Sequence, residues 1–244
     1  MNAGHSQKTH TFPALALFAA FSLAAPAWAA PDAAAVVRCL AAAYPQTVTA
    51  ADTPDAVLVR RQKVPIGKSM AGRYERRMDE AGLLDQFAQR YPDPKTFAVP
   101  EPGQEPGRMH NYAFFDAMYG KSREEARAQL VRVSWPPARQ KVQFSRVNGA
   151  NRALEAAGQE IAAVPELRRY VSSPTLVFDY GKSYDAARKS VHSYGIAIDF
   201  ELPPAVNKYW RWDGCREGAD CAYPAAVLED ETLRRLVEIF ERGK

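Results

Sequence analysis

One short segment of the sequence combines residue types that bind metal ions. Ser190-Val-His-Ser-Tyr-Gly-Ile-Ala-Ile-Asp199 contains an imidazole and a carboxylate, and both groups are suitable ligands for zinc. On one unbroken strand, their separation of seven residues would point His192 and Asp199 to opposite faces. The two side chains therefore converge only if the chain bends between them, and Gly195 is placed to provide that bend.

A strand that begins at Gly195 would separate two kinds of side chain. Gly195, Ala197 and Asp199 would share one face, which leaves room for an ion and a substrate beside the carboxylate. The opposite face would be apolar and suited to a core, with Ile196, Ile198 and Phe200. The other interpretation is a histidine that is hydrogen-bonded in a loop and an aspartate that caps a turn. The residues alone leave both interpretations open.

Composition and missing motifs exclude several other classes of protein. With 47% apolar and 25% charged residues, the 244-residue chain is typical of a folded globular protein. Its net charge of +4 is not gathered into a clustered basic face, so we expect no nucleic-acid partner. The sequence contains no phosphate-binding loop, no Ser-x-x-Lys or Gly-x-Ser-x-Gly nucleophile and no His-Glu-x-x-His pair.

The N-terminus is typical of a secretory signal peptide, which we assign to residues 1–29. The run from Ala14 to Ala25 is interrupted only by Ser22, and small residues follow in the pattern expected before a cleavage site. Twelve residues are too few to cross a hydrocarbon core, which needs about 20. We therefore expect a periplasmic or secreted protein with no stable membrane insertion after cleavage.

Two of the three cysteines enclose a short polar loop near the C-terminus. In an oxidising compartment Cys215 and Cys221 are the expected disulfide pair, the alternative being two reduced thiols at the surface. Cys39 lies beside apolar residues of a helical stretch, and we expect it to be a buried, small apolar residue.

Periodicity and turn signals predict an α+β fold with two regions. An N-terminal region, 30–107, ends in a proline-rich strap, and a second region spans 108–244. Expected helices cover 32–44, about 80–90, 112–119, 122–130, 151–163 and a closing segment with Leu233, Leu236, Val237 and Phe240 on one face. Expected strands cover 56–60, 131–135, 142–147 and 195–200.

The Ser-x-His-x-x-Gly-x-Ala-x-Asp segment resembles the first metal motif of a peptidase family. That family comprises zinc D-alanyl-D-alanine carboxypeptidases of the vancomycin-resistance type and L-alanyl-D-glutamate endopeptidases. The likeness extends over about residues 105–244 through Val131–Trp135, Asn148-Gly149, Tyr170, Arg188 and Tyr209–Trp212. It implies a hedgehog-like zinc-peptidase domain, with a small, mainly antiparallel sheet and flanking helices. The implied partner is the peptidoglycan stem peptide and the implied cofactor is Zn²⁺.

The resemblance also assigns roles to individual residues. His192 and Asp199 would be two of three protein ligands to zinc, and Ser190 would contact substrate. Tyr209 and Trp210 belong to an aromatic run that would line the peptide groove or pack in the core. Relatives place an arginine before the motif to polarise the scissile carbonyl; here Tyr180-Gly181 stands at that position. The candidates for its role are therefore the neighbouring Lys182 and Arg188.

One part of the family pattern has no match in this sequence. A later Asp-x-x-His or Glu-x-x-His segment supplies relatives with a third ligand and the general base, and no histidine follows His192 here. His110 as a ligand and Glu201 as a base are weak substitutes. A zinc peptidase needs three ligands, a bound water and a base, so we expect this chain as given to be weak or inactive.

The sequence leaves two other functions open. One is a non-catalytic cell-envelope protein that keeps the scaffold and a peptide-binding groove. The other is a hydrolase of a different substrate that uses His192 with His110.

Overall fold

The computed structural model describes residues 32–68, 80–88, 109–181, 188–204, 206, 227 and 229–242. Several sequence predictions fall outside these residues: the signal peptide, the proline-rich strap, Lys182, Tyr209, Trp210 and the Cys215–Cys221 pair. They stay predictions.

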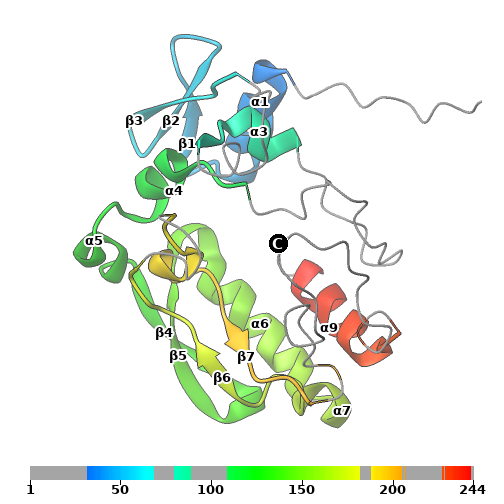
Figure 1. Cartoon of the computed structure of the whole chain (residues 1–244). Coiled ribbons are helices and arrows are strands. Elements are labelled where there is room, and N and C mark those ends of the chain that lie inside the picture. Colours follow the sequence, from blue (N-terminus) through cyan, green and yellow to red (C-terminus); the bar gives the residue numbers. More distant parts are fainter. Residues whose placement is uncertain are drawn as a thin grey trace, which may run out of the picture.

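The N-terminal elements form a small sheet covered by helices (Figure 1). Helix α1 (Ala33–Ala43) begins after Asp32, whose carboxylate accepts a hydrogen bond from the Ala35 amide, and it ends before Pro45. This helix confirms the prediction for 32–44. The following elements are β1 (Val48–Ala50), β2 (Ala56–Val59), β3 (Gln62–Pro65), α3 (Leu83–Ala88) and α4 (Tyr112–Tyr119). The three strands pair antiparallel in chain order.

Cys39 contradicts the expectation that it is buried. Val36 and Leu40 are the buried residues of α1, whereas Cys39 is an exposed free thiol. Half-buried Val37 extends the apolar stripe to the side away from Cys39, so the cysteine falls outside the stripe.

The later elements surround a β-hairpin (Figure 1). They are α5 (Arg123–Arg127), β4 (Leu130–Trp135), β5 (Gln140–Ser145), α6 (Ala150–Ala162), α7 (Pro165–Arg168), β6 (Pro174–Leu176), β7 (Asp199–Phe200) and α9 (Glu231–Arg242). Short 3₁₀ turns occur at η1 (Pro136–Ala138), η2 (Val147–Gly149) and η3 (Val191–Tyr194). Strands β4 and β5 pair antiparallel, as do β6 and β7.

The mixture of helices and antiparallel strands agrees with the predicted α+β class. The predicted small sheet is, in the described residues, three separate sheets of three, two and two strands. The hedgehog-like architecture implied by the family stays a prediction.

Two large hydrophobic cores hold the described elements together, and Ala81 and Met109 form a separate small cluster. The first core gathers residues of α1, the N-terminal sheet, α3 and α4, and it includes Val147 and Tyr194 from later in the chain. The second core lies between the β4–β5 hairpin, α6, α7 and α9 and includes Trp135, Leu154, Ile161 and Ile239. The first core thus contains residues from before and from after residue 108. The predicted division into two domains there stays a prediction.

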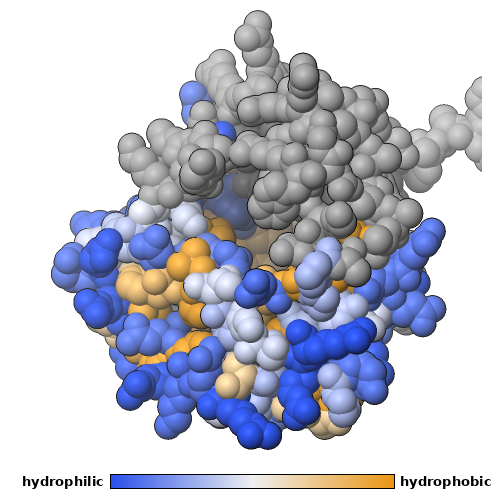
Figure 2. Space-filling model, turned by 60° about the horizontal axis from the view of Figure 1, so that its bottom comes forward, coloured by the Kyte–Doolittle hydropathy of each residue, from blue (hydrophilic) through white to orange (hydrophobic). Residues whose placement is uncertain are grey.

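The described part of the face seen in Figure 2 carries more polar than apolar side chains. The face seen in Figure 2 carries hydrophilic side chains around its rim, with apolar residues showing in patches between them. Among the helices of the described ranges, none has the length and apolar character needed to cross a membrane.

Candidate metal centre

His192 lies on η3, a single 3₁₀ turn whose two ends are fixed by neighbouring residues of the motif. The Ser190 hydroxyl accepts a hydrogen bond from the His192 amide at 3.3 Å and caps the turn. Gly195 ends it with φ 63° and ψ 37°, in the left-handed region that glycine adopts most easily. A Cβ at Gly195 would also collide with the Leu130 side chain. The predicted bend at Gly195 is therefore confirmed.

The strand predicted to begin at Gly195 is wrong for residues 195–198. The Gly195 carbonyl accepts a hydrogen bond from the Ser145 amide at 2.8 Å, at the end of β5. With Gly195 in the left-handed region, the chain enters extended pairing only at Asp199 and Phe200, opposite β6. The apolar side chains expected on the core face do pack inward: Ile196 against the first core, and Ile198 and Phe200 against the second.

The bend brings the two predicted ligands together. His192 Nε2 lies 3.3 Å from Asp199 Oδ2. The other ring nitrogen, Nδ1, lies 3.2 Å from the Val177 carbonyl oxygen, which would accept a proton carried on Nδ1. Nε2 faces the carboxylate, so the two groups attract each other only through a proton or a cation that both can bind. Since 11% of the His192 side chain and 57% of the Asp199 side chain are exposed, one ligand is buried and the other is open to solvent.

The separation of the two groups fits a direct hydrogen-bonded pair, and it would also admit a shared zinc ion. Two ligands with zinc bonds of about 2.0–2.1 Å in a tetrahedral arrangement lie about 3.3–3.4 Å apart, which matches the observed separation of 3.3 Å. A backbone carbonyl on the second ring nitrogen is also the usual support of a metal-binding histidine. Within the part of the chain that the structure describes, however, no group of three or more His, Cys, Asp or Glu side chains is suited to a metal ion.

The remaining predicted residues have diverse surroundings. Ser190 caps η3, and its substrate role stays a prediction. Arg188 is half-buried in the stretch that leads into the motif. His110 packs against aromatic rings of α4, with its centroid 5.2 Å from that of Phe115. Exposed Glu201 follows β7, and its amide donates to the Ser173 carbonyl. Neither His110 nor Glu201 completes a three-donor group with the pair.

A polar cluster beside η3 was not predicted from the sequence. Asp116 Oδ1 of α4 accepts hydrogen bonds from Lys189 Nζ at 2.6 Å and from the Tyr194 hydroxyl at 2.7 Å. Tyr194 is fully buried, and burial, followed by the hydrogen bond to Asp116, raises its pKa well above the usual range of a phenol. One signal was available, because Asp116 is the only charged residue of the apolar helix Tyr112–Tyr119.

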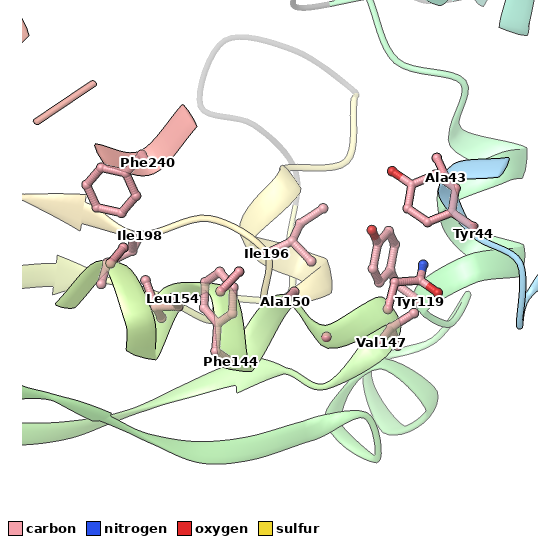
Figure 3. A pocket seen from close by; sticks show the side chains of 14 residues that line it. Ala43, Tyr44, Tyr119, Phe144, Val147, Ala150, Leu154, Ile196, Ile198 and Phe240 are labelled. Atoms are coloured by element: carbon pink, nitrogen blue, oxygen red, sulfur yellow. The ribbon is translucent and has the colours of Figure 1, made fainter. Parts of the chain in front are cut away.

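A largely apolar cavity of about 710 Å³ lies next to the motif (Figure 3). Ile196 and Ile198 point into it, as do residues of α1, α4, β5, α6 and α9. Burial raises the pKa of Tyr44 and of Tyr119 in its wall. His192 and Asp199 are not among the lining residues, so the cavity is distinct from the ligand pair.

A family model described as D-alanyl-D-alanine carboxypeptidase matches residues 184–243, about a quarter of the chain. The motif region is similar to these peptidases. The resemblance predicted from the motif is thus confirmed over residues that include both His192 and Asp199. The match supports a metallopeptidase of the carboxypeptidase type. No curated protein and no solved structure matches the chain.

Proposed function

We propose that this chain is an exported, zinc-dependent, peptidase-like protein that acts on D-alanine-containing peptides of peptidoglycan. Zinc would be held by His192 and Asp199. The observation that carries the proposal is the 3.3 Å approach of His192 Nε2 to Asp199 Oδ2 within a segment that matches the carboxypeptidase family.

Each residue around the pair has a distinct part in this proposal. Bound zinc would supply a Lewis acid and lower the pKa of a coordinated water to about 7. With zinc on Nε2, the remaining ring proton would lie on Nδ1 and would be donated to the Val177 carbonyl. The exposed carboxylate of Asp199 keeps the pair accessible to a peptide. Arg188 is our candidate for the cation that faces the substrate.

The proposed activity is weak. Two protein ligands hold zinc less firmly than three, and the family's general base has no counterpart in the sequence. Loss of an outer-shell partner alone typically lowers metal affinity or activity by about 10–100-fold, so loss of a ligand should cost more. Peptide binding by the scaffold would then be the main property that remains. A chain with that property alone is the non-catalytic alternative.

The test is D-alanine release from a peptide that ends in D-Ala-D-Ala, measured with zinc and the full chain. We expect slow release that His192→Ala abolishes and that Glu160→Gln, in an exposed ion pair on α6, leaves unchanged. Release that persists in His192→Ala would contradict the metal mechanism. Peptide binding without any release would instead favour the non-catalytic alternative.

A further inference from the structure

Helix α4 packs the rings of Phe115 and Tyr119 against Tyr194, and it also makes polar contacts with the segment that carries His192. Asp116 Oδ1 accepts from Lys189 Nζ and from the Tyr194 hydroxyl. Lys189 precedes His192 in the chain and Tyr194 follows it, so one side chain of α4 contacts both ends of the turn. The Lys189 ammonium also lies over the rings of Tyr180 and Tyr194, 5.5 and 5.3 Å from their centroids.

Residues just after α4 hold the stretch that contains Val177, whose carbonyl faces the His192 ring. The Tyr180 hydroxyl donates to the Lys121 carbonyl at 2.6 Å, and Arg123 Nη2 donates to the Tyr180 carbonyl at 3.0 Å. Tyr180 lies in the stretch that contains Val177. The Asp179 amide in turn donates to the His192 carbonyl at 3.3 Å. Residues 116–123 therefore hold both the turn with His192 and the chain whose Val177 carbonyl faces Nδ1.

Partial burial and charge strengthen the contacts of Asp116. The Asp116 and Lys189 side chains are 29% and 23% exposed, so water screens their attraction less than that of a surface pair. Both hydrogen bonds end on a charged acceptor, the kind that stabilises most. Removing the charge of Asp116 would leave an ammonium among aromatic rings and weaken the acceptor of a buried phenol.

We propose that Asp116 is a positioning residue of the metal centre, acting through Lys189 and Tyr194 to hold the His192 ring with Nδ1 at the Val177 carbonyl and Nε2 at Asp199. This inference rests on the proposed function for its consequence, because the orientation sets how well Nε2 serves as a ligand. The orientation itself exists in the metal-free chain and is measurable there.

The test compares Asp116→Asn with Glu160→Gln, a matched change of a carboxylate in an exposed ion pair far from the cluster in sequence. Long-range ¹⁵N–¹H NMR reports which ring nitrogen of His192 carries the proton, at about pH 8.5 where an ordinary imidazole is neutral. Because a fixed ring orientation favours one tautomer, we expect a single tautomer to dominate in the unmodified chain and in Glu160→Gln, and a mixture of both tautomers in Asp116→Asn. Zinc affinity, from competition with a chromophoric chelator, should fall about tenfold in Asp116→Asn alone.

A second variant distinguishes loss of the Asp116 contact from loss of the folded structure. Tyr194→Phe keeps the ring and removes only the hydroxyl, and it should shift the tautomers in the same direction as Asp116→Asn. The double variant should be no worse than Asp116→Asn, because both changes act on one contact. An unchanged tautomer in folded Asp116→Asn would overturn the positioning role. A wild-type chain that shows the expected tautomers but binds no zinc would overturn the proposed function instead.

Discussion

The two cores hold opposite ends of the metal motif in different ways. The first core holds the His192 end through a buried tyrosine whose hydroxyl is bound to Asp116. The second core holds the Asp199 end by stacking: the rings of Trp135 and Phe200 lie 5.3 Å apart, and those of Trp135 and Phe240 lie 6.3 Å apart. The buried ligand, His192, is thus held through a hydrogen bond to Asp116, whereas the exposed ligand, Asp199, is held through stacked aromatic rings. The spacing of the pair therefore depends on both cores.

Truncating the stack should have the largest effect. Trp135 is fully buried, and its Nε1 donates to the Val171 carbonyl at 2.9 Å. Trp135→Ala should lower the free energy of unfolding by about 3–5 kcal/mol, from the lost packing and the cavity that remains. Urea unfolding followed by circular dichroism measures it. Trp135→Phe is the control and should cost less, since part of the stack survives. A loss below about 1 kcal/mol in Trp135→Ala would contradict the assigned role of the stack.

A substitution at Gly195, between the residues that pack into the two cores, should have the next largest effect on the free energy of unfolding. Gly195→Ala should destabilise by about 1–3 kcal/mol, because alanine is strained at φ 63° and its Cβ meets Leu130. The control is Gly181→Ala, where a Cβ meets no atom within 4 Å. The unfolding free energies of both variants decide the comparison. Equal losses would show that the bend is not specifically required.

The stability of the protein at alkaline pH should report on Tyr194 in the first core. Burial and Asp116 raise the pKa of Tyr194 above that of a free phenol, near 10, so the folded state holds its proton more tightly than the unfolded state. The resulting stabilisation is complete below about pH 10 and is lost as pH rises toward the folded-state pKa. Tyr194→Phe should make stability between about pH 10 and 11 less dependent on pH. An unaltered pH dependence would place the alkaline sensitivity elsewhere, for example at Tyr119.

The smallest effect is expected where neither core is involved. Arg242 of α9 pairs with Glu160 of α6, and both side chains are more than half exposed. Glu160→Gln should therefore change the free energy of unfolding by less than about 1 kcal/mol. Thermal unfolding at low and high salt measures it. A larger, salt-dependent loss would mean that this pair contributes substantially to holding α9 against the second core.

Local patterns predicted much of the fold. The periodic apolar residues and caps of α1, α4, α6 and α9 lie in the sequence itself, and so do the alternating strands of the β4–β5 hairpin. The segment 195–198 was mispredicted because its alternation is that of a strand. Its backbone instead follows the left-handed Gly195 and a tertiary hydrogen bond from Ser145.

The candidate site was predictable only in part. The approach of His192 to Asp199 followed from the odd spacing and the glycine between them. Asp116 lies 78 residues before Tyr194, and no local rule links such distant positions. Its isolation as a charge within an apolar helix marked it as unusual but did not indicate its partners.

Zinc affinity in a double-mutant cycle of His192→Ala and Asp199→Ala tests the central claim most directly. Equilibrium dialysis of the full chain and the three variants gives the four dissociation constants. If one ion is shared, each single change should weaken binding at least tenfold, and the double change should weaken it little further. A wild-type chain that binds no zinc, or single variants that retain its affinity, would contradict the account.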